Sequence, residues 1–528
     1  MTAKKMKNMR VASFSNFVLV ASGILFLVSC ASLPEDVERV ESHVLQNTES
    51  TKLAKDLEPL LAQHPDQSGF NLLNKGMDAF IARIALIEAA EKSLDVQYYI
   101  WHDDLTGKVI HNRLLHAADR GVRVRLLLDD LDTGGKEKTL HIIDSHPNIE
   151  IRLFNPFANR SVRATDFATD LSRVNHRMHN KSLTADNRAT ILGGRNIGDE
   201  YFEATEGVAF GDLDVIGIGP VVNDVSKAFD LYWNSQWVYP LSAFSKGEPV
   251  SEEKINTFRK QSDAFLEDAR DSAYNAALKE TNMAKLPHIG EISYSWGRWV
   301  LVYDDPSKVE AKEIKEDTHL APSLVKAFEK TNKDLIVISP YFVPGDKLTA
   351  YFTDMVNRGV RVRILTNSLS ANDVKIVHAG YMRYRKDLIK GGVELYEYKP
   401  TIDQTVAKEN KKSGWSGSSR ASLHAKSFAF DQQYIFVGSF NLDARSVALN
   451  TEMGVYFESP EYAKMVAKSF DEKAMLKTFK VELDEDNDLV WVTQENGSES
   501  RFNKEPNTSW WTRFTTGFLS IFVIESQL

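Results

Sequence analysis

The chain has 528 residues, of which 43% are hydrophobic and 26% are charged, and its formal net charge is −9. These proportions are typical of a globular protein, and the length exceeds one hydrophobic core, so two or more domains are expected. The acidic balance argues against a protein that holds nucleic acid on a broad basic surface. No nucleic-acid partner is therefore expected.

The first 29 residues predict a signal peptide, because they contain four basic residues and no acidic one and include a short apolar run at 17–28. The run is too short to predict a membrane span. It leads to Leu-Val-Ser-Cys, ending at Cys30, the only cysteine, and this sequence resembles the lipobox of bacterial lipoproteins. The resemblance implies a lipid anchor on Cys30 at a bacterial membrane. Ala31 then favours the periplasmic face of the outer membrane, if the cell is Gram-negative. A cleaved signal peptide or a signal anchor with a chance cysteine is the alternative.

Residues 30–70 are polar and predict a tether with one or two helices, followed by a first domain over 71–242. Hydrophobic periodicity in this domain predicts a helix, a strand, a helix and a strand, over 79–91, 94–101, 105–119 and 122–128. The β-α-β order favours a parallel sheet with a right-handed crossover. Polar residues 243–300, with a helical pattern to about residue 279, predict an insertion between domains.

A second domain is expected over 301–484, where the pattern recurs as a strand, a helix and a strand over 335–339, 346–357 and 360–366. Residues 403–420 predict a basic loop of the kind that borders a site. The C-terminal extension, 485–528, contains an apolar and aromatic run at 510–524. This run either lies in a membrane interface or docks on the body of the protein, since it is too short for a comfortable span.

The pattern His-x-Lys-x4-Asp occurs twice, 245 positions apart. The two copies consist of His179, Lys181 and Asp186, and of His424, Lys426 and Asp431. Each is followed by a small turn that ends in asparagine, with Gly194 and Asn196 in the first copy and Ser439 and Asn441 in the second. The sequence Arg-Gly-Val-Arg-Val-Arg also recurs, at 120–125 and 358–363. Self-similarity over this length predicts two copies of one fold.

Two histidines beside two lysines suit chemistry on a phosphate ester. Residues i and i+2 of a strand face one side, so each histidine and its lysine are expected to share a face. Together the copies supply a nucleophile, a general acid and two cations, which is enough for phosphoryl transfer without a metal or cofactor. Aligned Asp212 and Glu452 are expected to orient the imidazole rings, with Asp214 as a rival of Asp212.

Three other groups of residues invite functional interpretations. His102, Asp103 and Asp104 give no convergent set of metal ligands by their spacing, so we expect them at the surface or behind the site. His378 and Tyr381 either contact a headgroup or form a satisfied, half-buried pair. Core packing is favoured over a ligand platform for the aromatic residues Tyr98, Tyr99 and Trp101.

The duplicated pattern resembles that of the phospholipase D superfamily, over roughly residues 94–471. The resemblance implies an α/β fold of two repeated domains, with mixed or parallel sheets flanked by helices and the active site at the domain interface. It also implies a ping-pong reaction in which one histidine attacks phosphorus and the other protonates the leaving alcohol; His179 is favoured as the nucleophile. Lysines 181 and 426 and asparagines 196 and 441 would hold the phosphate, supported by Gly194 and Ser439. Asp186 and Asp431 complete the catalytic motifs and are expected to support local structure rather than chemistry.

Within the superfamily, the chain most resembles the cardiolipin synthase C branch of bacterial phosphatidyltransferases. The resemblance rests on the segments 97–101, 177–182, 196–202, 339–344, 378–385 and 505–511. It implies phosphatidyl transfer between phospholipids, with phosphatidylglycerol as substrate and phosphatidylethanolamine as a second candidate. Phospholipase D hydrolysis to phosphatidic acid is the close alternative. A phosphodiester nuclease and a non-enzymatic lipid-binding lipoprotein are further ones, and the intact motifs argue against the last.

Overall fold

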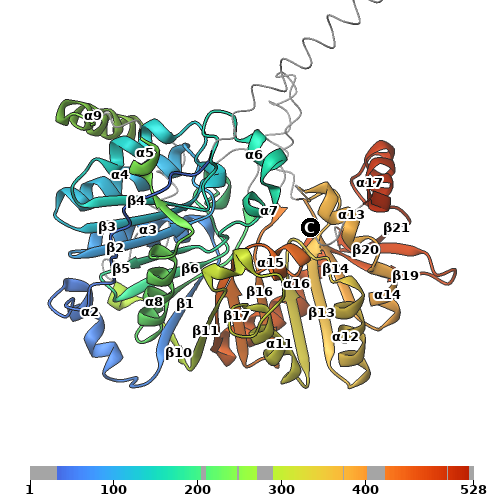
Figure 1. Cartoon of the computed structure of the whole chain (residues 1–528). Helices are drawn as coiled ribbons and strands as arrows, with labels where there is room; N and C mark the ends of the chain where they lie inside the picture. The colour runs from blue at the N-terminus through green and yellow to red at the C-terminus, as the bar shows by residue number, and fades with distance from the viewer. Residues whose placement is uncertain are drawn as a thin grey trace, which may run out of the picture.

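The computed structural model describes residues 32–203, 210–245, 249–269, 289–372, 374–400, 422–495 and 497–522. Two large sheets lie side by side, each flanked by helices (Figure 1). The predicted α/β class with a repeated domain is therefore confirmed. Among these residues, no helix is both long and apolar enough to cross a membrane.

The first sheet contains nine strands. Their order is β10 (Ser295–Gly297), β1 (Ser68–Leu73), β8 (Asp214–Ile218), β6 (Ala189–Gly193), β5 (Ser182–Ala185), β2 (Ser93–Tyr98), β3 (Arg123–Asp129), β4 (Ile149–Phe154) and β9 (Val238–Pro240). Strands β2, β3 and β4 are parallel, whereas β5, β6 and β8 run antiparallel to their neighbours. The helices of this half are α2 (Lys52–Leu61), α3 (Gly76–Ala89), α4 (Leu105–Asp119), α5 (Glu137–Asp144), α6 (Ala164–Thr169), α7 (Leu171–Val174), α8 (Val221–Trp233) and α9 (Glu252–Ala269).

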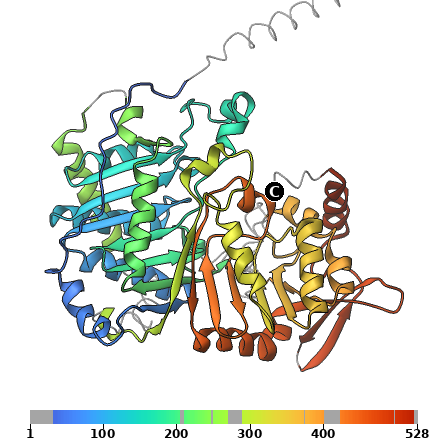
Figure 2. The same cartoon turned by 60° about the horizontal axis from the view of Figure 1, so that its bottom comes forward.

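The second sheet contains ten strands and repeats the same core. Their order is β11 (Trp299–Tyr303), β18 (Met453–Glu458), β17 (Tyr434–Gly438), β16 (Ser427–Phe430), β12 (Asp334–Ile338), β13 (Arg361–Asn367), β14 (Glu394–Tyr398), β19 (Thr478–Leu483), β20 (Leu489–Glu495) and β21 (Ser498–Phe502). Its helices are α11 (Ala321–Glu329), α12 (Gly345–Asn357), α13 (Lys375–Tyr381), α14 (Arg385–Lys390), α15 (Ala444–Ala448), α16 (Pro460–Lys477) and α17 (Trp510–Phe522). Figure 2 shows α16 lying across the second sheet, where it contacts β16, β17, β19 and β20.

The order β8-β6-β5-β2-β3-β4 in one sheet corresponds to β18-β17-β16-β12-β13-β14 in the other, including the parallel pairs. Predicted and observed boundaries agree closely around the crossovers: the helix expected over 105–119 is α4, and that expected over 346–357 is α12. The strand expected over 94–101 ends earlier, at Tyr98. Beyond it the backbone turns, and Ile100 N donates to Asn196 Oδ1 at 3.3 Å.

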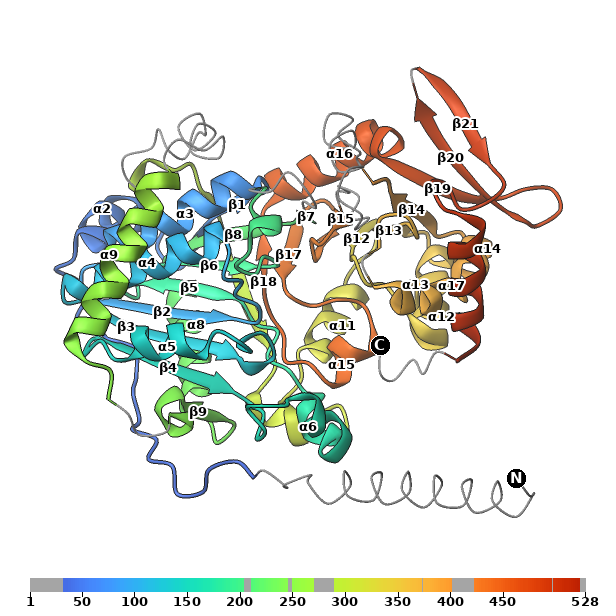
Figure 3. The same ribbon diagram turned by 90° about the horizontal axis from the view of Figure 1, so that it is seen from above.

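The two halves share a hydrophobic core where they meet. Phe70 on β1 stacks on Phe457 on β18, with ring centroids 4.1 Å apart. Around this pair, buried Leu192 and Val215 from the first half cluster with Val437 from the second. A third, two-stranded sheet also joins the halves, because β7 (Phe210–Gly211) pairs in parallel with β15 (Ser422–Leu423), as Figure 3 shows from above. Elements that lie far apart in the sequence are thus held in a fixed relation where the halves meet.

The C-terminal extension is tied to the second domain by a buried polar network. Glu505 accepts hydrogen bonds from Arg385 at 2.7 Å and from His378 at 3.4 Å. Arg385 and the Tyr381 hydroxyl in turn donate to Glu397, at 3.1 and 3.0 Å. His378 and Tyr381 are almost fully buried, so the structure favours the internal pair over a headgroup contact.

Candidate active site

The two motif histidines lie at the junction of the halves, in short segments that enter matching strands. His179 precedes β5 and His424 follows β15 and precedes β16. Both are buried, with 6% of their surface exposed. Each imidazole is therefore largely screened from water, and neighbouring side chains determine its pKa and its hydrogen bonds.

Each histidine is oriented by an acid from the opposite half. Glu452 Oε2 lies 2.8 Å from Nδ1 of His179, and Asp212 Oδ2 lies 2.5 Å from Nδ1 of His424. The backbone repeats this exchange: His179 N donates to Thr451 O at 2.8 Å, and His424 N donates to Gly211 O at 2.8 Å. The predicted role of both acids agrees with these contacts, whereas the exchange between halves was not predicted.

Asp214, the predicted rival of Asp212, faces another partner. Its carboxylate forms buried ion pairs with Arg83 at 2.8 Å and with Arg195 at 3.4 Å. It also accepts a hydrogen bond from the Arg195 backbone N–H at 3.1 Å. Asp214 therefore fixes the turn that follows β6.

The motif lysines create a positive potential inside the site. Lys181 and Lys426 are buried, and each ammonium group donates to the carbonyl oxygen of its own motif histidine. Burial lowers the pKa of His179 well below its usual range, and the charges of both lysines lower it further. Burial and Lys426 also lower the pKa of His424, although Asp212 opposes them. Burial lowers the pKa of Lys181 well below its usual range, Lys426 lowers it further, and Glu452 opposes them. An anion bound between the two lysines would favour their charged forms.

The two orienting acids differ in their surroundings. Burial raises the pKa of Glu452 to about 7 despite the nearby Lys181 charge, and the hydroxyls of Ser439 and Ser446 donate to it at 2.5 and 2.9 Å. Burial acts in the same direction on Asp212, but the hydrogen bond and charge of His424 outweigh it and lower the pKa of that carboxyl. Asp212 is thus the more acidic of the two orienting carboxyls.

The turn residues support these acids. Ser439 donates to Glu452 through its side chain, whereas Gly194, at the matching position, leaves room for Asp212. A Cβ atom on Gly194 would lie 2.2 Å from Asp212 Oδ1. Both residues therefore act on the orienting carboxylates, and the phosphate support expected of them stays a prediction.

The two turn asparagines are not equivalent. Asn196 Nδ2 donates to the Tyr201 hydroxyl at 3.0 Å, and its Oδ1 accepts from Ile100. Asn441 is 4% exposed, and its Oδ1 has no hydrogen-bond partner in the part of the chain that the structure describes. Because the two amide atoms of asparagine are exchanged by a flip, Asn441 can present an N–H group to a bound phosphate.

Asp186 and Asp431 lie at the other ends of β5 and β16 from the lysines, and each binds backbone. Asp186 accepts hydrogen bonds from the N–H groups of residues 91, 92 and 93 at 2.7–3.0 Å. Asp431 accepts from those of residues 332, 333 and 334 at 2.7–3.0 Å. Each aspartate thus fixes the start of a central parallel strand, which agrees with the structural role expected for it.

Sequence reasoning missed a matched pair of residues that hold the histidine segments. Asp129, at the end of β3, accepts from Met178 N at 2.8 Å. Asn367, at the same position of β13, accepts from Leu423 N at 2.9 Å and donates to its carbonyl oxygen at 2.9 Å. Both positions end the strands that open with the repeated Arg-Gly-Val-Arg-Val-Arg sequence, and this repeat was the available signal.

Two tyrosines border the histidines, both from the first half. The Tyr99 ring meets His179 edge-on, with centroids 4.9 Å apart, and the Lys181 ammonium lies 5.2 Å from the Tyr99 centroid. The Tyr201 ring meets His424 in the same way at 5.3 Å. Tyr99 is half-buried and borders the site, whereas Tyr98 and Trp101 lie in the core as predicted.

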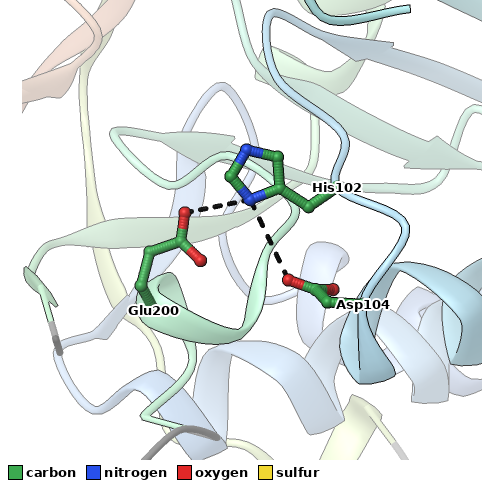
Figure 4. Close-up of side chains that lie close together, drawn as sticks. All are labelled: His102, Asp104 and Glu200. Atoms are coloured by element: carbon green, nitrogen blue, oxygen red, sulfur yellow. Dashed lines mark ion pairs between the residues drawn. The ribbon is translucent and has the colours of Figure 1, made fainter. Parts of the chain in front are cut away.

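A second polar cluster lies near Tyr201, and sequence spacing did not predict its composition. His102, Asp104 and Glu200 bring their ligand-type atoms within 4.8 Å of one another (Figure 4). His102 Nδ1 lies 3.1 Å from Glu200 and 3.9 Å from Asp104. Both Asp104 oxygens already accept backbone N–H groups, from Gly107 at 3.0 Å and Asp199 at 2.7 Å, so Asp104 serves as a helix cap. The cluster is explained as an ion pair beside that cap.

A family model described as "Cardiolipin synthase, PLD-like domain" matches residues 84–233 and 324–474. The chain therefore belongs to this family of the phospholipase D superfamily, and the double match confirms the predicted repeat. Its resemblance to the cardiolipin synthase C branch is confirmed as well: it is 44% identical over 477 residues to cardiolipin synthase C of Escherichia coli (strain K12), covering 90% of this chain and 99% of the relative.

More distant proteins are also similar to this chain. Cardiolipin synthase A of Pseudomonas syringae pv. syringae is 27% identical over 398 residues, which is 75% of this chain and 66% of that protein. The crystal structure of a phosphatidylserine synthase from Haemophilus influenzae Rd KW20 has a TM-score of 0.55 and 14% identity, covering 90% of this chain and 100% of that one. At this identity the likeness shows the fold alone.

Two predicted features lie outside the described residues. Cys30 with its lipobox-like sequence falls within 1–31, and the whole basic loop at 403–420 falls within 401–421. Both stay predictions from the sequence.

Proposed function

We propose that the protein synthesises cardiolipin by moving a phosphatidyl group from one phospholipid to a hydroxyl group of another. The observation that carries this proposal is the pair of buried histidines, each oriented by an acid of the opposite half, beside two buried ammonium groups. This arrangement supplies a nucleophile, a proton donor and charge neutralisation for a phosphodiester. The 44% identity to a cardiolipin synthase C supports a lipid substrate.

In the first step, His179 Nε2 attacks the phosphorus of phosphatidylglycerol. A P–N bond forms, the bond from phosphorus to the headgroup oxygen breaks, and His424 Nε2–H gives its proton to that oxygen so that glycerol leaves. Glu452 accepts the Nδ1 proton of His179 in a hydrogen bond and keeps Nε2 free to attack. Lys181 and Lys426 balance the charge that gathers on the phosphate oxygens.

In the second step, His424, now neutral, removes the proton from the hydroxyl of a second phospholipid. The alkoxide oxygen bonds to phosphorus, the P–N bond breaks, and cardiolipin leaves with His179 restored. Water in place of the second lipid would give phosphatidic acid by the same chemistry. The two outcomes therefore differ only in which hydroxyl reaches the phosphohistidine.

The acids support this division of roles. The pKa of the Asp212 carboxyl is lowered, so it stays ionised and favours a protonated His424, as a general acid requires. The pKa of His179 lies well below its usual range, which suits a nucleophile that must be neutral. A phosphodiester anion bound between the lysines would raise the pKa of both imidazoles and prepare His424 to donate.

The test is a lipid assay on the purified full-length protein with phosphatidylglycerol, alone and with phosphatidylethanolamine, with products resolved by mass. We expect cardiolipin from the wild type and none from His179→Ala or His424→Ala. His43→Ala, which removes a histidine that is 63% exposed, is the matched control and should keep full activity. Phosphatidic acid as the main product would move the assignment to a hydrolase, and no product from any lipid would refute it.

We also propose that acylation of Cys30 holds the protein at the periplasmic side of a membrane. The basic flank, apolar run and Leu-Val-Ser-Cys sequence support this anchor. Metabolic labelling with a fatty acid should mark the wild type, and Cys30→Ser should lose the label. An unlabelled wild-type protein would contradict the anchor.

A further inference from the structure

Helix α17 presents a row of large apolar side chains to solvent. The exposed fractions are 65% for Trp510, 62% for Trp511, 51% for Phe514, 54% for Phe518 and 69% for Ile521. The only charged residue in the helix, Arg513, turns back and donates to the Thr508 carbonyl oxygen at 2.7 Å. Soluble proteins rarely leave such a surface uncovered unless something binds it.

The helix is fixed, and its aromatic side chains form one continuous surface. Its inner side packs on α13, and Thr516 is fully buried. Just before the helix, the buried Glu505 network ties the chain to the second domain. The Phe514 ring lies 5.2 Å from that of Trp510 and 5.7 Å from that of Trp511. Because the helix is docked, its apolar side has a defined direction relative to the rest of the molecule.

A second, smaller apolar patch lies at α6 and α7. Val162, Phe167 and Leu171 are 54%, 41% and 52% exposed, and we call them the 162–171 patch. Figure 1 shows α6, α7 and α17 at the upper side of the molecule, over different halves. From above, in Figure 3, α15 lies between α6 and α17. The α15 residue Ser446 donates to Glu452, so the two apolar regions flank the elements of the candidate active site.

We propose that α17 and the 162–171 patch rest on the surface of a lipid bilayer, with the active site between them facing the lipid headgroups. Exposed Trp and Phe side chains on a helix without free charge suit the interface between headgroups and acyl chains. Thirteen residues extend for about 20 Å, less than the roughly 30 Å of a bilayer core, so α17 lies along the surface instead of crossing it.

The position of the two regions favours a bilayer over a protein partner. A partner that covered both regions would also cover the site between them, whereas a bilayer that covers both delivers the substrate there. This argument rests on the proposed function, because it takes the substrate to be a membrane phospholipid. It adds an orientation of the enzyme, which neither the repeat nor the site chemistry defines.

The test places an environment-sensitive fluorophore at single positions of the full-length chain. Cys30→Ser removes the only native thiol and the proposed anchor, after which Phe518→Cys, Leu171→Cys or Met465→Cys adds one label site. Met465 on α16 is 48% exposed and is the matched control. With phosphatidylglycerol–phosphatidylethanolamine vesicles, we expect blue-shifted emission and quenching by a lipid-borne quencher at 518 and 171, and neither at 465.

Labels at 518 and 171 that keep their aqueous emission on vesicle-bound protein would overturn the proposal. A blue shift at 518 that depends on protein concentration without vesicles would instead assign α17 to contact between copies of the chain, and would overturn it too. These readouts need no turnover, so they decide the docking even if the protein makes no cardiolipin.

Activity gives the second readout. Replacing Trp510, Trp511, Phe514 and Phe518 together by Ser should lower the rate on vesicles by about tenfold or more, since the loss of that much apolar contact weakens binding by at least this factor. The rate on short-chain phosphatidylglycerol that is monomeric in water should not change. Met465→Ser with Leu476→Ser, two exposed α16 positions, should affect neither rate. Equal losses on both substrates would overturn the proposal.

Discussion

Replacing Asp212 by Asn should separate the two steps of the reaction. Asp212 is the partner of His424, the proposed general acid and base, at 2.5 Å in a buried setting. Removing one charge of a buried pair typically costs about 3–5 kcal/mol, which corresponds to a rate lower by about a hundredfold to several thousandfold. We expect the overall rate of cardiolipin formation to fall by this factor.

The loss should depend on the leaving group. A phosphatidyl nitrophenyl ester releases a phenolate that needs no proton, so His179 can still attack it in the Asp212→Asn enzyme. We expect a rapid burst of nitrophenolate, equal to one per active site, followed by slow turnover because His424 no longer activates the incoming hydroxyl. The phosphohistidine should accumulate on His179 and be found by mass analysis of rapidly quenched protein.

Glu452→Gln is the matched comparison, because it changes the partner of the proposed nucleophile. It should lower the burst rate itself and leave no accumulated intermediate. If Glu452→Gln accumulated phosphohistidine and Asp212→Asn did not, the roles of the two histidines would be reversed. If the two variants behaved alike, the argument from exchanged acids would be wrong.

Further changes test the supports of the site and of the tail. Asp186→Ala and Asp431→Ala each leave backbone N–H groups without their hydrogen-bond acceptor, so the free energy of unfolding in urea should fall by about 2–4 kcal/mol. The activity of the molecules that remain folded should persist. Gly194→Ala places a methyl group against Asp212, so kcat should drop by about tenfold or more with little change in melting temperature. Burial raises the pKa of Glu505, but its bonds to a histidine and an arginine outweigh this and lower it from 4.5 to about 2. The stability that this carboxylate adds is therefore complete above pH 4.5 and is lost as the pH falls through about 2; Glu505→Gln should lower stability at neutral pH by about 3 kcal/mol and flatten its fall in acid.

The sequence predicted those features that depend on local patterns. Hydrophobic periodicity located α4 and α12, and the duplicated motif located both histidines and both lysines. The alignment between the copies also found Asp212 and Glu452, because they hold the same place before matching strands. These signals are local in the sequence or repeat within it, so they can be read without knowing how the two halves pack together.

Other features depend on how the halves meet. Which acid serves which histidine cannot be read from a repeat, because 273 residues separate His179 from Glu452 and both halves carry either kind of group. Glu200 joins His102 only after a turn brings together two segments 98 positions apart. Asp129 and Asn367 both hold the segment before a motif histidine, but they differ in residue type, so the repeat did not reveal this shared role.

The exchange of acids between the halves determines when the chain becomes active during its synthesis. A growing chain that has completed its first half possesses His179 and Lys181, but the carboxylate that orients this imidazole is made more than 270 residues later. Likewise, the second half alone would lack the partner of its own histidine. Neither half is therefore a small working enzyme, and reactivity toward phosphodiesters arises only when the complete chain has closed on itself. A protein that is cleaved or opened between its halves should therefore lose its activity toward lipids.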